Sequence, residues 1–166
     1  MNQVVKYFSG EKSESYVFLG IGIIGLVLAI FFLFSFKTSF WKGVAIPFII
    51  VSILEMIVGI TLIYRTPKDI ARVEHHISND PVMIKTEEIP RMEKVMQNFV
   101  IFRYVEIALI ILGAVLMYFF RGHMFWNGLG LGLFIQSGIV LVLDFFAEQR
   151  GEIYLTFLKS SSIAMW

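Results

Sequence analysis

The chain has 166 residues, of which 57% are hydrophobic and 16% are charged, and its formal net charge at pH 7 is +1. This length provides one small domain without a separate soluble catalytic module, and the low net charge implies no nucleic-acid partner. The sequence contains no cysteine, which excludes disulfides, thiol nucleophiles, iron–sulfur clusters and cysteine zinc sites.

Four apolar segments make up about half of the chain, and they cover residues 16–36, 44–64, 99–120 and 123–146. The apolar core of a bilayer is roughly 30 Å thick, and a helix of about 20 apolar residues crosses it. Four such helices are too many to be buried in one water-soluble core of this size. The sequence therefore predicts an all-α integral membrane protein. We expect an antiparallel four-helix transmembrane bundle that forms a single domain over residues 1–166.

The polar segment at residues 65–98, between the second and third spans, is predicted to be a helical cytoplasmic excursion. Thr66 and Pro67 have the pattern of an N-cap followed by proline at the first helical position. The residues from Ser78 to Pro81 should end this short helix. A second helix is expected to start at Pro90 and to continue into the third span.

Apolar residues of this excursion recur at helical spacing and predict a partner-binding surface. They are Ile70, Val73, Ile77, Met92 and Met96. Methionine adapts to partners of varied shape. The alternative is that the methionine face packs against the preceding amphipathic helix. The tail, residues 147–166, is expected to be either an interfacial helix or a continuation of the fourth span.

The distribution of Lys and Arg predicts the orientation. One side carries ten of these residues: Lys6, Lys12, Arg65, Lys68, Arg72, Lys85, Arg91, Lys94, Arg150 and Lys159. The other side carries Lys37, Lys42 and Arg121. This bias predicts that both termini are cytoplasmic, and together with the lack of a targeting sequence it favours a bacterial inner membrane.

Polar residues within the spans are the strongest candidates for function. Glu55 lies near the middle of the second span, where an acidic side chain costs about 2.5 to 3.5 kcal/mol. Glu106 is three residues after Arg103 in the third span, and Gln136 lies at a similar depth in the fourth. The sequence predicts that these four residues form one intramembrane polar cluster.

Two interpretations of this cluster remain open. In the functional interpretation, a desolvated glutamate takes up and releases a proton or binds a cation. In the structural interpretation, the pairs Glu106–Arg103 and Glu55–Gln136 are satisfied and fix the register of the helices.

Small residues predict where the helices approach one another, because they let backbones come close in lipid. The candidate helix-packing residues are Gly22, Gly25, Ser52, Gly59, Gly113, Gly128 and Gly132. Their stripes can all face the interior of one bundle.

Neither a cofactor site nor a metal site is expected. Gly20 to Gly25 matches a dinucleotide fingerprint but lies inside an apolar helix, without the strand that the motif requires. His75 and His76 are adjacent, so on a helix they point about 100° apart and cannot easily share a metal ion.

Three functions from different classes remain open. The first is a non-enzymatic membrane protein that acts through helix packing and its cytoplasmic surface, as a subunit of a membrane complex or as a homo-oligomer. The alternative is a proton- or cation-conducting channel or small transporter that uses Glu55 and Glu106. The third is a membrane enzyme acting on lipid, for which the sequence offers no nucleophile, metal set or basic headgroup site.

Overall fold

The computed structural model describes residues 2–164, which form four long helices and a short connection. The elements are α1 (Asn2–Ser35), α2 (Ser39–Asn79), α3 (Pro81–Met83), the π-helix η1 (Ile84–Glu88), α4 (Ile89–Phe119) and α5 (Met124–Ala164). All four long helices are long and apolar enough to cross a membrane. The prediction of four membrane-span-like helices in an all-α fold is therefore confirmed.

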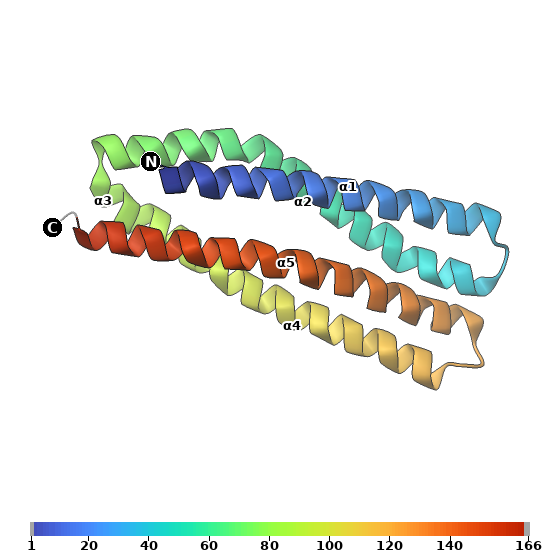
Figure 1. Cartoon of the computed structure of the whole chain (residues 1–166). Coiled ribbons are helices and arrows are strands. Elements are labelled where there is room, and N and C mark those ends of the chain that lie inside the picture. Colours follow the sequence, from blue (N-terminus) through green and yellow to red (C-terminus); the bar gives the residue numbers. More distant parts are fainter. Residues whose placement is uncertain (1, 165–166) are drawn as a thin grey trace.

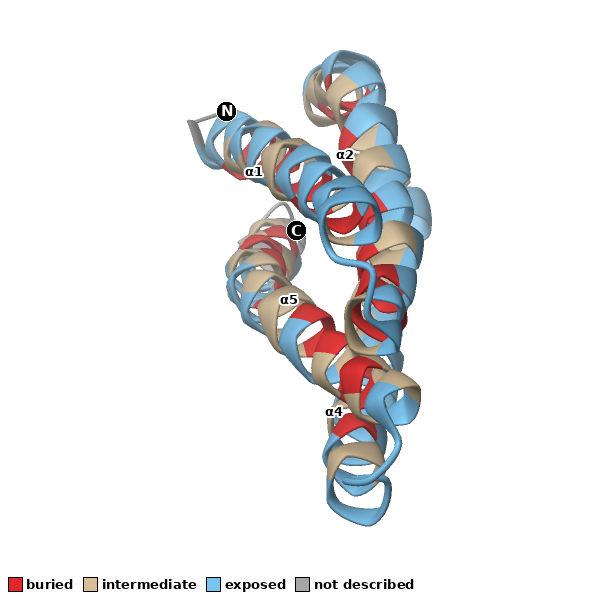
Figure 2. Ribbon diagram, turned by 90° about the vertical axis from the view of Figure 1, so that its right-hand side faces the viewer, coloured by how far each residue is buried: buried red, intermediate tan, exposed pale blue. Residues whose placement is uncertain are grey.

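The helices pack as two neighbouring pairs. α1 packs along α2, α4 packs along α5, and α5 joins the pairs by packing against α2 and α1. Both termini lie at one end of the bundle, together with α3 and η1, and the two short turns lie at the other end (Figure 1). Buried residues gather on the helix faces that are turned toward neighbouring helices (Figure 2).

The prediction that a separate helix begins at Pro67 is wrong, because Pro67 lies inside α2. The Thr66 hydroxyl does not cap a new helix but donates a hydrogen bond to the carbonyl oxygen of Leu62, at 2.7 Å. Proline removes one backbone donor and bends a helix without always ending it. α2 accordingly changes direction part-way along its length (Figure 1). It ends at Asn79, within the stop signal expected from the sequence.

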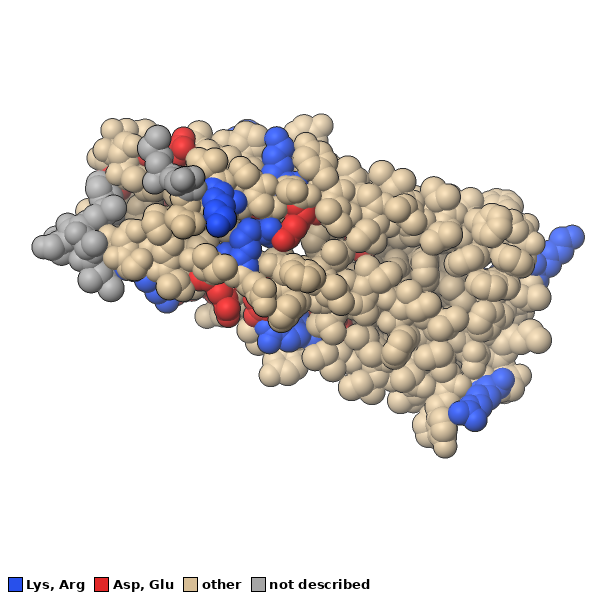
Figure 3. Space-filling view, in the orientation of Figure 1, with Lys and Arg blue, Asp and Glu red and all other residues tan. Residues whose placement is uncertain are grey.

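The helices extend well beyond the apolar segments at the end that carries the termini. α2 and α5 have 41 residues each, which corresponds to about 60 Å of helix and twice the thickness of a bilayer core. Of the two forms considered for the tail, the structure shows the continuation of the fourth apolar segment. We call residues 2–15, 65–98 and 147–164 the inner extension. In the visible face, charged side chains gather toward this end of the molecule, with a few more at the opposite tip (Figure 3).

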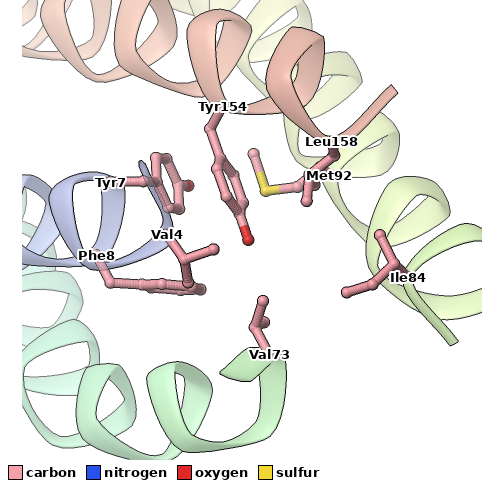
Figure 4. Close-up of a cluster of buried hydrophobic side chains, with 8 residues drawn as sticks. All are labelled: Val4, Tyr7, Phe8, Val73, Ile84, Met92, Tyr154 and Leu158. Carbon is pink, nitrogen blue, oxygen red and sulfur yellow. The ribbon is translucent and has the colours of Figure 1, made fainter. Parts of the chain in front are cut away.

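The inner extension has its own apolar core (Figure 4), which is formed by Val4, Tyr7, Phe8, Val73, Ile84, Met92, Tyr154 and Leu158. The rings of Tyr7 and Tyr154 stack with centroids 4.1 Å apart. This core joins the inner ends of all four long helices, so it holds the two helix pairs together outside the apolar segments.

The predicted partner-binding surface is part of this core and is not a free surface. Val73 and Met92 are fully buried, and Ile70 and Ile77 pack against them. Met96 is partly buried, with its sulfur against Gly151 of α5. The sequence indicated an amphipathic face correctly, but the inner ends of α1 and α5 cover that face.

A charge network surrounds this core. Glu88 accepts hydrogen bonds from Arg91 Nε at 2.9 Å and Arg91 Nη2 at 2.6 Å, and from the Tyr154 hydroxyl at 3.2 Å. Arg72 bridges Glu88 and Asp69, at 3.5 and 3.1 Å. The network therefore links η1 to α2, α4 and α5 through charges that all have partners, as buried charges require.

The predicted packing residues lie at contacts between helices of this chain. Gly22, Gly25 and Gly59 bring α1 and α2 together, Gly113 brings α4 against α5, and Ser52, Gly128 and Gly132 lie between α2 and α5. A Cβ added at Gly128 would meet the backbone of Phe40. The contacts at Gly128 and Gly132 lie toward the end with the two short turns, and the contact of Gly59 with Ser15 and Leu19 lies at the border of the inner extension.

Candidate functional site

A cavity of about 380 Å³ lies between the four long helices, where the inner extension meets the apolar part of the bundle. Its wall is mainly apolar, with side chains such as Phe18, Leu54, Phe99, Phe102 and Val140. It also carries five acidic residues and one basic residue, namely Glu11, Glu14, Glu55, Glu106, Asp144 and Arg150. The cavity is partly open to the exterior, and Figure 3 shows a small opening beside the charged side chains.

Glu55 lies on the wall of the cavity and is almost fully buried. Its residue is 3% exposed, and neither carboxyl oxygen has a hydrogen-bond partner among the residues that the structure describes. It lies on the same face of α2 as Val51, Val58 and Leu62, which also line the cavity. An isolated carboxylate is costly to bury among apolar groups, so this group favours a bound proton or a cationic partner.

Glu106 and Asp144 bring a second pair of carboxyl groups to the cavity wall, from α4 and α5. Both residues line the cavity, and Glu106 Oε2 is buried without a hydrogen-bond partner within residues 2–164. Two neighbouring carboxylates repel each other when both are ionised. The pair is therefore also suited to hold a proton or to face a positive charge.

The acidic residues at the inner mouth of the cavity differ from Glu55 because they have basic partners. Arg150 forms an ion pair with Glu14, and Arg65 pairs with Glu11 at 3.2 Å. These positive charges balance the acids at the mouth. Arg103 also lies near Glu106 and Asp144, but it is paired with Glu148. The cavity is thus most acidic in its interior.

The structure separates the predicted polar cluster. Glu55 and Glu106 share the cavity, but Gln136 lies outside its lining and donates a hydrogen bond to the Ser52 hydroxyl, at 3.4 Å. Ser137, the next residue along α5, faces the cavity in its place. Neighbouring helix positions point about 100° apart, and here Gln136 is turned toward Ser52 while Ser137 lines the cavity.

Within residues 2–164, no hydrogen bond or ion pair joins Glu106 to Arg103 or Glu55 to Gln136. Arg103 forms its ion pair with Glu148 of α5. Spacing along one helix allowed Arg103 to reach Glu106 but did not show that a carboxylate of the next helix was closer. Asp144, Glu14 and Arg150 were missed as site residues, although their position near the apolar boundary was visible in the sequence.

Comparison with models of protein families, with curated proteins and with solved structures found no match for this chain. Function must therefore be inferred from the cavity itself.

The cavity reaches only part of the way along the bundle. Its deepest lining residues include Phe18, Val51, Leu109 and Ser137. Beyond them, the close contacts at Gly25, Gly43 and Gly128 bring α1, α2 and α5 together. The lining therefore ends part-way along the bundle, and beyond it the described helices are in close contact.

Proposed function

We propose that this chain is a four-span integral membrane protein that binds and releases a proton or cation on Glu55, and that it acts as a small transporter. The main support for this proposal is the position of Glu55. Its carboxyl group is buried on the wall of a cavity formed by all four long helices and has no hydrogen-bond partner in the described chain. Intramembrane acids in such positions are typical of proton and ion pathways.

The proposed topology is an antiparallel bundle with both termini in the cytoplasm, in a bacterial inner membrane. The excess of Lys and Arg at the end of the inner extension supports this orientation. The cavity then opens on the cytoplasmic side. Its acid-lined interior lies within the inner half of the membrane.

A transporter fits the geometry better than the other functions considered. A continuously open channel is disfavoured by the glycine contacts that close the bundle beyond the cavity. The interaction function loses its main support because the surface expected to bind a partner is the core of the inner extension. Assembly with a protein partner or into a homo-oligomer stays a prediction from the sequence.

The proton site can be tested by infrared difference spectroscopy on the purified full chain in lipid. A pH change should alter the carbonyl band of protonated carboxyl groups, and Glu55→Gln should remove one component of that change while keeping the size of the side chain. Glu93→Gln is the matched control, because Glu93 is 45% exposed and pairs with Lys159. Identical spectra for the wild-type chain and Glu55→Gln would refute proton binding at Glu55.

A further inference from the structure

The charged residues inside the cavity indicate whether its ligand carries a positive or a negative charge. Glu55, Glu106 and Asp144 line its deeper part, and the one basic residue of the described lining, Arg150, is paired with Glu14 at the mouth. A negatively charged ligand would be repelled by this interior. A positive group would compensate a carboxylate that has no protein partner.

The volume and the lining of the cavity indicate the size and the apolar character of its ligand. A volume of about 380 Å³ is in the range of small-molecule sites, and much larger than a bare ion needs. Phe18, Phe99 and Phe102 add aromatic rings to the wall, and aromatic faces attract organic cations. A mainly apolar molecule with one positive charge would therefore pack against the apolar lining and balance the charge of a carboxylate.

A neighbouring cavity of about 360 Å³ adjoins this site. It lies between α4 and α5 and shares Phe99, Glu106 and Asp144 with the first cavity. Its other wall includes Val142 and Phe146, which are each 56% exposed, and the ion pair between Arg103 and Glu148, in which the positive charge is balanced. A ligand dissolved in the bilayer would meet this second cavity first.

From these features we infer that the cavity binds an amphiphilic organic cation, and that the cation displaces a proton from Glu55. The inference rests on the proposed function of Glu55. One cation enters, the O–H bond of the Glu55 carboxyl breaks, and one proton leaves to water. The charge of the occupied site is therefore the same before and after the exchange, which limits the cost of either state in apolar surroundings.

Tetraphenylphosphonium is a suitable probe, because it is apolar, permanently charged and has no proton to lose. Its binding to the purified full chain in mild detergent would be measured by equilibrium dialysis, and proton release by a pH electrode in weakly buffered solution. We expect saturable binding, release of one proton per bound cation, and weaker binding as the pH falls. Triphenylphosphine oxide, a neutral compound of related shape, should bind much more weakly.

Variants distinguish the role of the carboxylate from that of the apolar wall. Glu55→Gln should weaken tetraphenylphosphonium binding by roughly tenfold or more, as expected when one member of a buried charge pair is removed. Glu55→Asp keeps the charge and should retain part of the affinity, and Glu93→Gln should bind like the wild-type chain. Thermal unfolding of each variant would verify that it is folded.

The outcomes separate this inference from the proposed function. If infrared spectra show a proton on Glu55 but tetraphenylphosphonium releases none and binds equally to Glu55→Gln, the cation inference is wrong and the proton site stands. If Glu55 carries no proton, both are wrong. Equal binding of the charged and neutral compounds, unaffected by Glu55→Gln, would show simple partition into the apolar cavity and overturn the inference.

Discussion

Two buried glutamates of this chain show how surroundings decide the role of a residue. Glu88 is 1% exposed and Glu55 is 3% exposed. Glu88 is contacted by Arg72, Arg91 and Tyr154, whereas neither oxygen of Glu55 has a partner in the described chain. Glu88 therefore stabilises the inner extension, whereas no contact in the described chain fixes the Glu55 carboxyl group in a structural role.

The close contact at Gly128 predicts that adding one methyl group there lowers the stability of the protein. Gly128→Ala would place a Cβ against the carbonyl group of Phe40 in α2. Because backbone cannot move aside cheaply, we expect a loss of about 1 to 3 kcal/mol in the free energy of unfolding. Unfolding by increasing amounts of denaturing detergent, followed by circular dichroism, would measure it.

Gly138→Ala is the control on the same helix. A Cβ at Gly138 meets no atom within 4 Å, and alanine favours a helix over glycine by about 1 kcal/mol. This variant should be as stable as the wild-type chain or more stable. Equal losses at the two positions would contradict the packing of α5 against α2 at Gly128.

The candidate site was predictable in part. Glu55 and Glu106 could be found because an acid within an apolar segment is costly and therefore conspicuous. Their surroundings could not, because the partner of a side chain depends on how each helix is rotated against its neighbours. Gln136 and Arg103 were for this reason assigned to carboxylates that they do not contact.

The ends of the helices were harder to predict than their apolar parts. Hydropathy marks the expected boundary between lipid and water. At Tyr64 and Phe146 the helices continue past that boundary. Turn residues gave better guidance, since α2 ends at Asn79, next to Asp80 and Pro81. The extended α1 had no such signal, because residues 2–15 are polar enough to suggest a loop.

The inner extension can be tested through its apolar core. Val73→Asp would place an unpaired charge at a position with no exposed surface, at a cost of several kcal/mol. We expect a lower unfolding temperature and faster proteolysis within residues 65–98. These are measured by circular dichroism and by mass spectrometry of the fragments.

Val82→Asp makes the same chemical change at a residue that is 56% exposed. It should leave the unfolding temperature within a few degrees of the wild-type value. If Val73→Asp is equally harmless, the face of α2 that carries Val73 is not packed as the structure shows, and a partner-binding role for that face would regain support.

At the scale of the whole molecule, the bundle has two parts with different surfaces. The apolar part exposes large side chains such as Phe34, Ile53 and Phe119, while the inner extension carries most of the charged residues. The cavity lies where the two parts meet. The proposed site is therefore next to both the charged and the apolar surfaces of the molecule.

The proposed orientation predicts which positions a membrane-impermeant thiol reagent can reach. The chain has no cysteine, so Gly122→Cys in the second short turn and Ser160→Cys in the inner extension would each be the single target. In intact cells, with the outer membrane made permeable, we expect labelling at position 122, and labelling at position 160 only after the inner membrane is opened. Labelling of both from the same side would contradict the four-span topology.

The core of the inner extension also sets the order in which the protein can be completed. Val4 and Phe8 pack with Tyr154 and Leu158, which the ribosome adds only after the other three long helices have been made. During translation, the apolar face of α1 that carries Val4 and Phe8 therefore lacks its contacts with α5 until Tyr154 and Leu158 have been added. A chaperone or insertion factor that protects the nascent chain would have to keep this face covered until that part of α5 is available.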